Sequence, residues 1–95
     1  MKEIVVAMET RQALANIVNV LEVSPFISEQ EQKLITVEFN LNFKSIDELR
    51  DLRNQVVKVC SDVKLVYRKR GAWGKYDRMD NLMSKVTMMI DGRLM

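Results

Sequence analysis

The alternation of apolar and polar residues is clearest between Lys33 and Phe43. Side chains in the stretch KLITVEFNLNF switch between the two kinds almost residue by residue, and the apolar positions include Ile35, Val37, Phe39, Leu41 and Phe43. A strand places successive side chains on opposite faces, and β-branched and aromatic residues favour that conformation. The pattern predicts a strand with one buried face and one polar face.

Helical spacing follows at Ser45. The run Ser45-Ile46-Asp47-Glu48 predicts a capping box, in which the Ser45 hydroxyl and the Glu48 carboxylate each accept a hydrogen bond from the other residue's backbone N–H. Apolar residues then recur every three or four positions, which places them on one side of a helix. They are Ile46, Leu49, Leu52, Val56 and Val59. We expect a helix that ends near Cys60.

Residues 62–70 alternate again and predict a second strand. Val63, Leu65 and Tyr67 share one face, and the other face is basic. The segment from Gly71 to Gly74 ends this strand, and Asp77 is the expected N-cap of a final helix over 77–91, stopped by Gly92. The apolar stripe of that helix either fills the core or meets a partner or another subunit. Its members are Met79, Leu82, Met83, Val86, Met89 and Ile90.

The first third of the chain allows two interpretations. Residues 2–8 can form a buried strand, followed by a helix capped at Thr10, or residues 3–22 can form one long helix. In the first case the residues that face inward from the helix are Ala13, Leu14, Ile17, Val18 and Leu21. The β-branched run Ile4-Val5-Val6 favours the strand. After Pro25, residues 26–28 suit a short edge strand, and the polar residues 29–32 suit a hairpin loop.

In chain order these elements give the pattern β-α-β-β-α-β with an extra C-terminal helix. This is the ferredoxin-like layout, an α+β sandwich in which two helices cover one face of a four-stranded antiparallel sheet. The second strand, residues 26–28, is the uncertain one, and a three-stranded α+β sheet remains without it. We expect a single domain over residues 1–95, with 77–91 as an appended amphipathic helix.

Composition agrees with one small globular domain. The chain has 95 residues, of which 47% are hydrophobic and 29% charged, and such a balance argues against intrinsic disorder. The lone Cys60 cannot form an intramolecular disulfide, and no secretion signal is evident, so we expect a cytoplasmic location. The longest apolar run is far shorter than the roughly 20 residues that cross a bilayer, so no membrane role is expected.

Little in the sequence supports catalysis or ligand chemistry. The chain has no histidine, and therefore lacks the side chain used most often as a general base near neutral pH. One cysteine cannot build a zinc site, and Gly71 and Gly74 lack the spacing of a phosphate loop. We expect no enzymatic activity, no metal and no cofactor.

Charge and aromatic residues gather between Lys64 and Arg78. The first 43 residues carry three basic and six acidic side chains, whereas residues 44–95 carry twelve basic and seven acidic ones. Cations neutralise phosphates, and aromatic rings stack on unpaired bases. The candidate nucleic-acid-binding residues are Lys64, Arg68, Lys69, Arg70, Trp73, Lys75, Tyr76 and Arg78.

Two functions follow, from different classes. The first is a small regulatory protein that binds nucleic acid, with RNA or single strands favoured over duplexes. The alternative is a protein-binding regulator or inhibitor, of the kind that phage and mobile elements encode, whose basic surface docks on an acidic partner. Defence of a sheet edge by basic residues would explain the same charges without a partner. The amphipathic final helix also leads us to expect a homo-oligomer.

Overall fold

The computed structural model describes residues 2–95, with side chains from residue 8 onward, and the regular secondary structure in this range is all helical. Its elements are α1 (Lys2–Ile17), α2 (Glu29–Glu38), the short 3₁₀ helix η1 (Leu41–Phe43), α3 (Ile46–Lys69) and α4 (Trp73–Leu94). No strand occurs between residues 2 and 95, so the expected α+β ferredoxin-like sheet is wrong.

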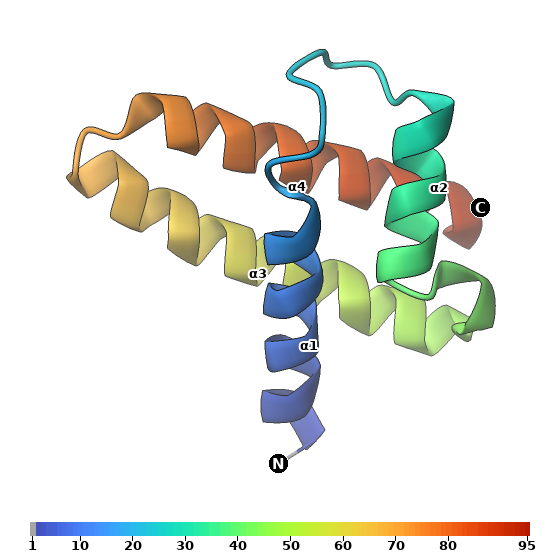
Figure 1. Ribbon diagram of the computed structural model, residues 1–95. Helices are drawn as coiled ribbons and strands as arrows, with labels where there is room; N and C mark the ends of the chain where they lie inside the picture. Colours follow the sequence, from blue (N-terminus) through green and yellow to red (C-terminus); the bar gives the residue numbers. More distant parts are fainter. Residues whose placement is uncertain (1) are drawn as a thin grey trace.

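A long antiparallel hairpin of α3 and α4 is the frame of the molecule (Figure 1). The 24 residues of α3 give it a length of about 36 Å at about 1.5 Å per residue. Helix α1 packs across α3, and α2 contacts both α1 and α4. The turn between α3 and α4 lies at the opposite end of the hairpin from α2 (Figure 1).

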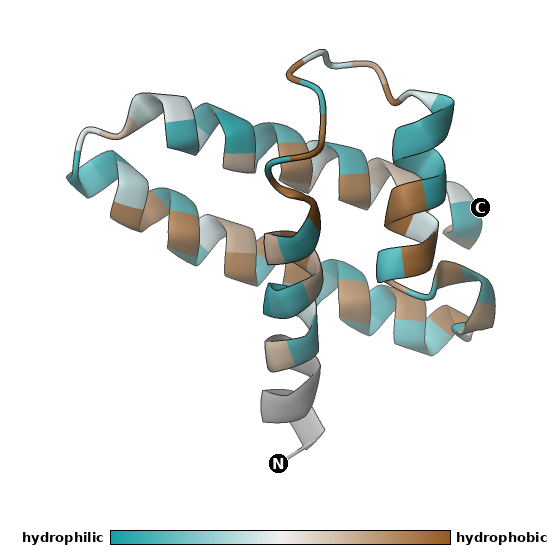
Figure 2. Cartoon of the chain, in the orientation of Figure 1, coloured by the Kyte–Doolittle hydropathy of each residue, from teal (hydrophilic) through white to brown (hydrophobic). Residues whose placement is uncertain are grey.

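The core lies where α1, α2 and the hairpin meet, and each helix contributes one apolar stripe. Figure 2 shows brown hydrophobic positions alternating with teal hydrophilic ones around the described helices. The fully buried side chains come from all four helices and η1: Ile17, Ile35, Leu41, Val56, Cys60, Leu82, Lys85, Val86 and Ile90. Several apolar residues of the connection between α1 and α2 remain in solvent, among them Val20, Val23 and Phe26.

The strand predicted over 33–43 is instead the end of α2 followed by η1. Ile35 and Phe39 are buried four residues apart, whereas Val37 and Phe43 are 70% and 87% exposed, so burial follows helical spacing. The helix begins at a capping box: Ser28 Oγ accepts from the Glu31 N–H at 3.1 Å, and Glu31 Oε1 accepts from the Ser28 N–H at 3.0 Å. The expected hairpin loop over 29–32 and edge strand over 26–28 are therefore wrong.

The second predicted strand, over 62–70, is the last part of α3. The capping box at Ser45 is confirmed, since Glu48 N–H donates to Ser45 Oγ at 3.2 Å and Ser45 N–H donates to Glu48 Oε1 at 3.0 Å. The helix continues past Cys60 because its stripe continues: Val63 and Tyr67 extend the three- and four-residue spacing and pack against the core. Ile46 is 57% exposed and does not belong to the stripe.

The two remaining helices are longer than expected or differently bounded. The N-terminal segment is one helix, so the favoured strand over 2–8 is wrong, and Thr10 lies buried inside α1 instead of capping it. The predicted inward residues Ala13, Leu14 and Ile17 are confirmed as buried. Helix α4 starts at Trp73, four residues before Asp77, and runs through Gly92.

A buried ion pair links α2 to α4. Lys85 Nζ lies 2.6 Å from Glu31 Oε2 and donates to the Glu22 carbonyl oxygen at 2.8 Å. The side chains of Lys85 and Glu31 are only 1% and 5% exposed. Burial alone would raise the pKa of Glu31, but hydrogen bonds from Lys85 and from the Ser28 and Glu22 N–H groups outweigh it, so this pKa lies below its ordinary value.

Candidate nucleic-acid interface

A Schellman motif ends α3 and shapes the hairpin tip, which we define as residues 65–75. Ala72 N–H donates to the Tyr67 carbonyl at 2.9 Å, and Gly71 N–H donates to the Arg68 carbonyl at 3.1 Å. Gly71 takes the left-handed conformation that this motif requires, with φ of 69°. The chain therefore reverses within three residues, and the end of α3 and the first turn of α4 lie side by side (Figure 1).

Four cationic side chains stand in solvent at this tip. They are Arg68 and Lys69 in the last turn of α3, Arg70 at its C-cap, and Lys75 in the first turn of α4. Among the residues that the structure describes, none of the four forms an ion pair. Favourable interaction with the helix dipole accounts for Arg68 and Lys69. It does not account for Lys75, because Lys75 lies at the positive end of α4.

Trp73 is the aromatic side chain that the tip exposes. It is 55% exposed at the start of α4, and its ring meets the Tyr76 ring edge-on, with centroids 5.5 Å apart. This contact holds the indole in one orientation while much of its surface stays open to solvent. An exposed, oriented aromatic ring beside unpaired cations can stack on a base while the cations contact phosphates.

Three of the predicted site residues interact with other residues of the same chain. Lys64 donates to Asp80 Oδ1 at 2.7 Å and its side chain is 16% exposed; that hydrogen bond raises the pKa of Lys64 above its ordinary value. Tyr76 is half-buried beneath the Lys64 ammonium, which lies 5.1 Å from its ring centroid. Arg78 is exposed but donates to Asn19 Oδ1 at 3.1 Å.

The apolar stripe of α4 faces the core of its own chain. Met79, Leu82, Val86 and Ile90 are buried. The other two members of the stripe, Met83 and Met89, are partly buried against the same core. Packing of this kind leaves little of the stripe for contact with a partner while the chain is folded.

A groove beside the tip was not foreseen from the sequence. It has a volume of about 580 Å³ and lies between the chain that leaves α1 and the first turns of α4. Its lining comprises Val18, Asn19, Tyr67, Gly74, Lys75, Arg78 and Met79. Asn19 and Arg78 are 59 residues apart in sequence, so no local pattern could have brought the two together.

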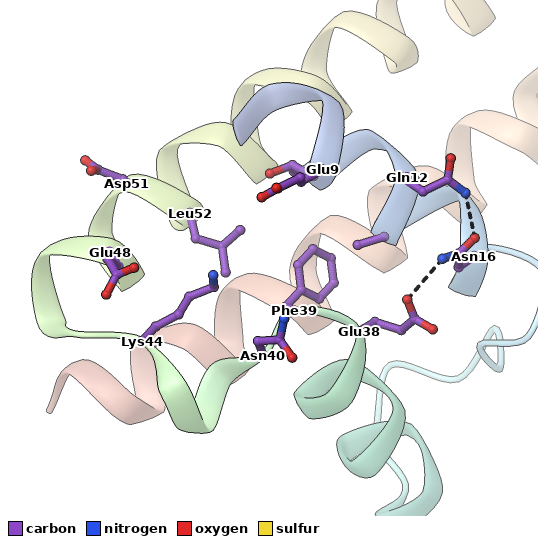
Figure 3. Close-up of a pocket in the computed structure, with 12 residues that line it drawn as sticks. Glu9, Gln12, Asn16, Glu38, Phe39, Asn40, Lys44, Glu48, Asp51 and Leu52 are labelled. Atoms are coloured by element: carbon purple, nitrogen blue, oxygen red, sulfur yellow. Dashed lines mark hydrogen bonds between the residues drawn. The ribbon is translucent and has the colours of Figure 1, made fainter. Parts of the chain in front are cut away.

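A second hollow, of about 440 Å³, lies at the other end of α3 and has the opposite charge (Figure 3). Carboxylates of Glu9, Glu38 and Asp51 line it together with that of Glu48, and Lys44 is the single cation among its lining residues. Asn16 links the hollow to α2 by donating to Glu38 Oε2 at 3.1 Å. An acidic lining repels phosphates, so we do not expect nucleic acid to bind there.

The described residues offer little reactive chemistry. Burial raises the pKa of the Cys60 thiol to about 12, so the thiolate is scarce at neutral pH. Among the side chains described from residue 8 onward, no group of three or more carboxylates or thiols is arranged so that it could hold a metal ion. None of the described helices combines the length and the apolar character that crossing a bilayer requires.

Of the predicted set, the tip contains Arg68, Lys69, Arg70, Trp73 and Lys75, whereas Lys64, Tyr76 and Arg78 contact other residues of the chain. Comparison with known proteins adds no assignment to this geometry: no family model, no curated protein and no solved structure matches the chain.

Proposed function

We propose that this protein binds nucleic acid without catalysing a reaction, and that RNA or single-stranded DNA is its preferred form. The observation that carries the proposal is the hairpin tip, where four exposed cations without ion-pair partners and a half-exposed indole lie within eight residues of one another in the chain. The cations supply affinity for phosphates, and Trp73 supplies a stacking surface that only an unpaired base can reach.

Contacts to the backbone dominate in this proposal. Neither the α3 end nor the first turn of α4 exposes an asparagine or a glutamine, the side chains suited to reading adenine. Sequence preference should therefore be weak. Affinity should fall steeply with salt, because each neutralised phosphate releases counterions.

The test is binding of a fluorescently labelled single-stranded RNA, followed by anisotropy at several salt concentrations. Four phosphate contacts predict a slope of log K against log salt near −3, at about −0.7 per phosphate. The doubly reversed variant Arg68→Glu/Arg70→Glu should bind more weakly, and its slope should be shallower by about 1.4. A duplex of equal length should bind less tightly than the single strand.

The matched control is Arg11→Glu/Lys58→Glu, which makes the same change in net charge at exposed positions of α1 and mid-α3. It should retain most of the affinity of the natural protein. Equal losses in the two double variants would mean that net charge alone governs binding, and would refute the assignment to the tip. Trp73→Ala should lower the affinity while leaving the salt slope unchanged, since stacking releases no counterions.

A protein partner is the second candidate, because the tip also exposes apolar surface. Leu65 and Val66 are 50% and 45% exposed on the last turns of α3, next to the cations. Docking on an acidic protein would bury them, whereas phosphate contacts would not. A partner that is recovered stoichiometrically after nuclease treatment, and lost with Leu65→Gln/Val66→Gln, would favour this candidate over nucleic acid.

A further inference from the structure

The groove beside the hairpin tip has the chemistry of a nucleotide site. The less exposed part of its lining is apolar and aromatic, and comprises Val18, Met79 and the half-buried Tyr67. Its rim carries two cations, Lys75 and Arg78, and the Asn19 amide. Among the described residues that line it, none bears a carboxylate. A ligand that matches this lining has a planar, weakly polar part and a negative charge.

The volume agrees with such a ligand. At about 580 Å³ the groove lies within the range of roughly 300–1,000 Å³ typical of small-molecule sites. Gly74 and Lys75 belong both to its lining and to the hairpin tip. A strand that lies across the tip is therefore next to the groove.

Arg78 is oriented before any ligand arrives. Its Nη1 donates to Asn19 Oδ1 at 3.1 Å, which uses one of the five N–H groups of the guanidinium and fixes its plane. The other donors remain for a phosphate, which arginine can contact through two parallel hydrogen bonds. Orientation in advance lowers the entropic cost of binding.

Lys75 covers the surface that a base would occupy. Its ammonium lies 6.0 Å from the centroid of the Tyr67 ring, which is the outer limit of a cation–π contact. Because this contact is weak, another group can readily displace the Lys75 ammonium from the Tyr67 ring. A base can take the place of the ammonium over Tyr67 while Lys75 turns to the phosphate of the same nucleotide.

We infer that the groove binds one nucleotide, with its base against Tyr67 and its phosphate between Lys75 and Arg78. The ligand is a 5′-phosphorylated nucleoside, either as a free mononucleotide or as one residue of a single strand. The inference rests on the proposed function for the second source, because the strand must first lie on the tip.

Titration of the protein with AMP and UMP, followed by nuclear magnetic resonance of its amides, tests the site directly. Shifts should concentrate around residues 18–19, 67 and 74–79. Adenosine and inorganic phosphate, used as separate probes, should each bind at least tenfold more weakly than AMP. Phosphate that binds as tightly as AMP would overturn the inference, and so would the absence of saturable shifts at millimolar nucleotide.

Variants separate the groove from the tip. Arg78→Gln, at an exposed position, should weaken AMP roughly 10- to 100-fold through the loss of charge-assisted hydrogen bonds. Tyr67→Leu should weaken it roughly tenfold through the loss of stacking. Arg93→Gln, an exposed cation at the far end of α4, is the matched control and should bind AMP normally. A loss in the control equal to that in Arg78→Gln would overturn the inference.

The tip variant Arg68→Glu/Arg70→Glu decides which proposal fails. It should lose affinity for a labelled single strand while its affinity for AMP stays within about threefold of that of the natural protein, since these side chains do not line the groove. Binding of strands without any binding of AMP would overturn the groove alone. Binding of AMP without any binding of strands would overturn the proposed function, and would restrict the groove to free mononucleotides.

Discussion

The buried pair Glu31–Lys85 gives the sharpest prediction about stability. The variant Glu31→Gln keeps the size and shape of the side chain but removes its charge. The Lys85 ammonium, whose side chain is 1% exposed, then has no counter-charge. Only the Glu22 carbonyl, at 2.8 Å, and a neutral amide remain to solvate it. Removing one partner of a buried pair typically costs about 3–5 kcal/mol, because the other charge stays buried without compensation.

A cost of this size is a large part of the total stability. The free energy of unfolding of a small domain is about 5–15 kcal/mol. A loss of about 3 kcal/mol lowers the unfolding temperature of a chain this short by roughly 12–24 °C. Thermal and urea unfolding, both followed by circular dichroism, measure the change. The apolar double variant Glu31→Leu/Lys85→Met is the control, and it should be more stable than Glu31→Gln because no charge remains to be solvated.

Acid should remove the difference in the free energy of unfolding between the natural protein and Glu31→Gln. The pKa of Glu31 in the folded chain lies below its ordinary value of 4.5. The contribution of the ionised Glu31 to stability is therefore complete at neutral pH. It begins to decrease as the pH falls below about 4.5, and it is lost as the pH falls through the lower pKa of the folded state. A cost for Glu31→Gln below about 1 kcal/mol at pH 7, or one that does not shrink on acidification, would refute the reasoning.

Three further predictions concern single residues. Gly71→Ala should destabilise the chain by about 1–2 kcal/mol in urea unfolding: an added Cβ meets no described atom within 4 Å, so the cost is that of a positive φ of 69°. Ser45→Ala should cost about 1 kcal/mol in the same assay through the lost cap, and a neutral result would mean that α3 needs no cap. The Cys60 thiol should react with an aromatic disulfide reagent only when the chain unfolds, because it is buried and its pKa is about 12; fast labelling of the folded protein would contradict this burial.

Apolar spacing predicted a helix correctly wherever the stripe was long. The positions from Leu49 to Val59 and from Met79 to Ile90 are inward in the structure as expected, because several turns of a helix repeat the same signal. Alternation over 33–43 misled because Ile35 and Phe39 satisfy a period of two and a period of four equally well. The capping box at Ser28 and Glu31 was the signal that could have decided between them.

The same ambiguity affected residues 62–70, where continuation of the α3 stripe through Val63 and Tyr67 competed with alternation. No glycine or proline interrupts the chain between Ser45 and Gly71, which favours one uninterrupted helix. The cations and Trp73 of the tip could be predicted as a group because they are neighbours in sequence. Two other contacts could not be predicted, because they depend on how α4 packs. They are the ion pair of Lys64 with Asp80 and the hydrogen bond from Arg78 to Asn19.

The position of Trp73 also makes the protein its own reporter. It is the one tryptophan in the chain, and it lies at the hairpin tip instead of in the core. Its fluorescence, excited where tyrosine does not absorb, will follow events at the tip, whereas circular dichroism follows the helices. An occupied tip and a melted fold should therefore give separate optical signals in one cuvette, without any attached dye.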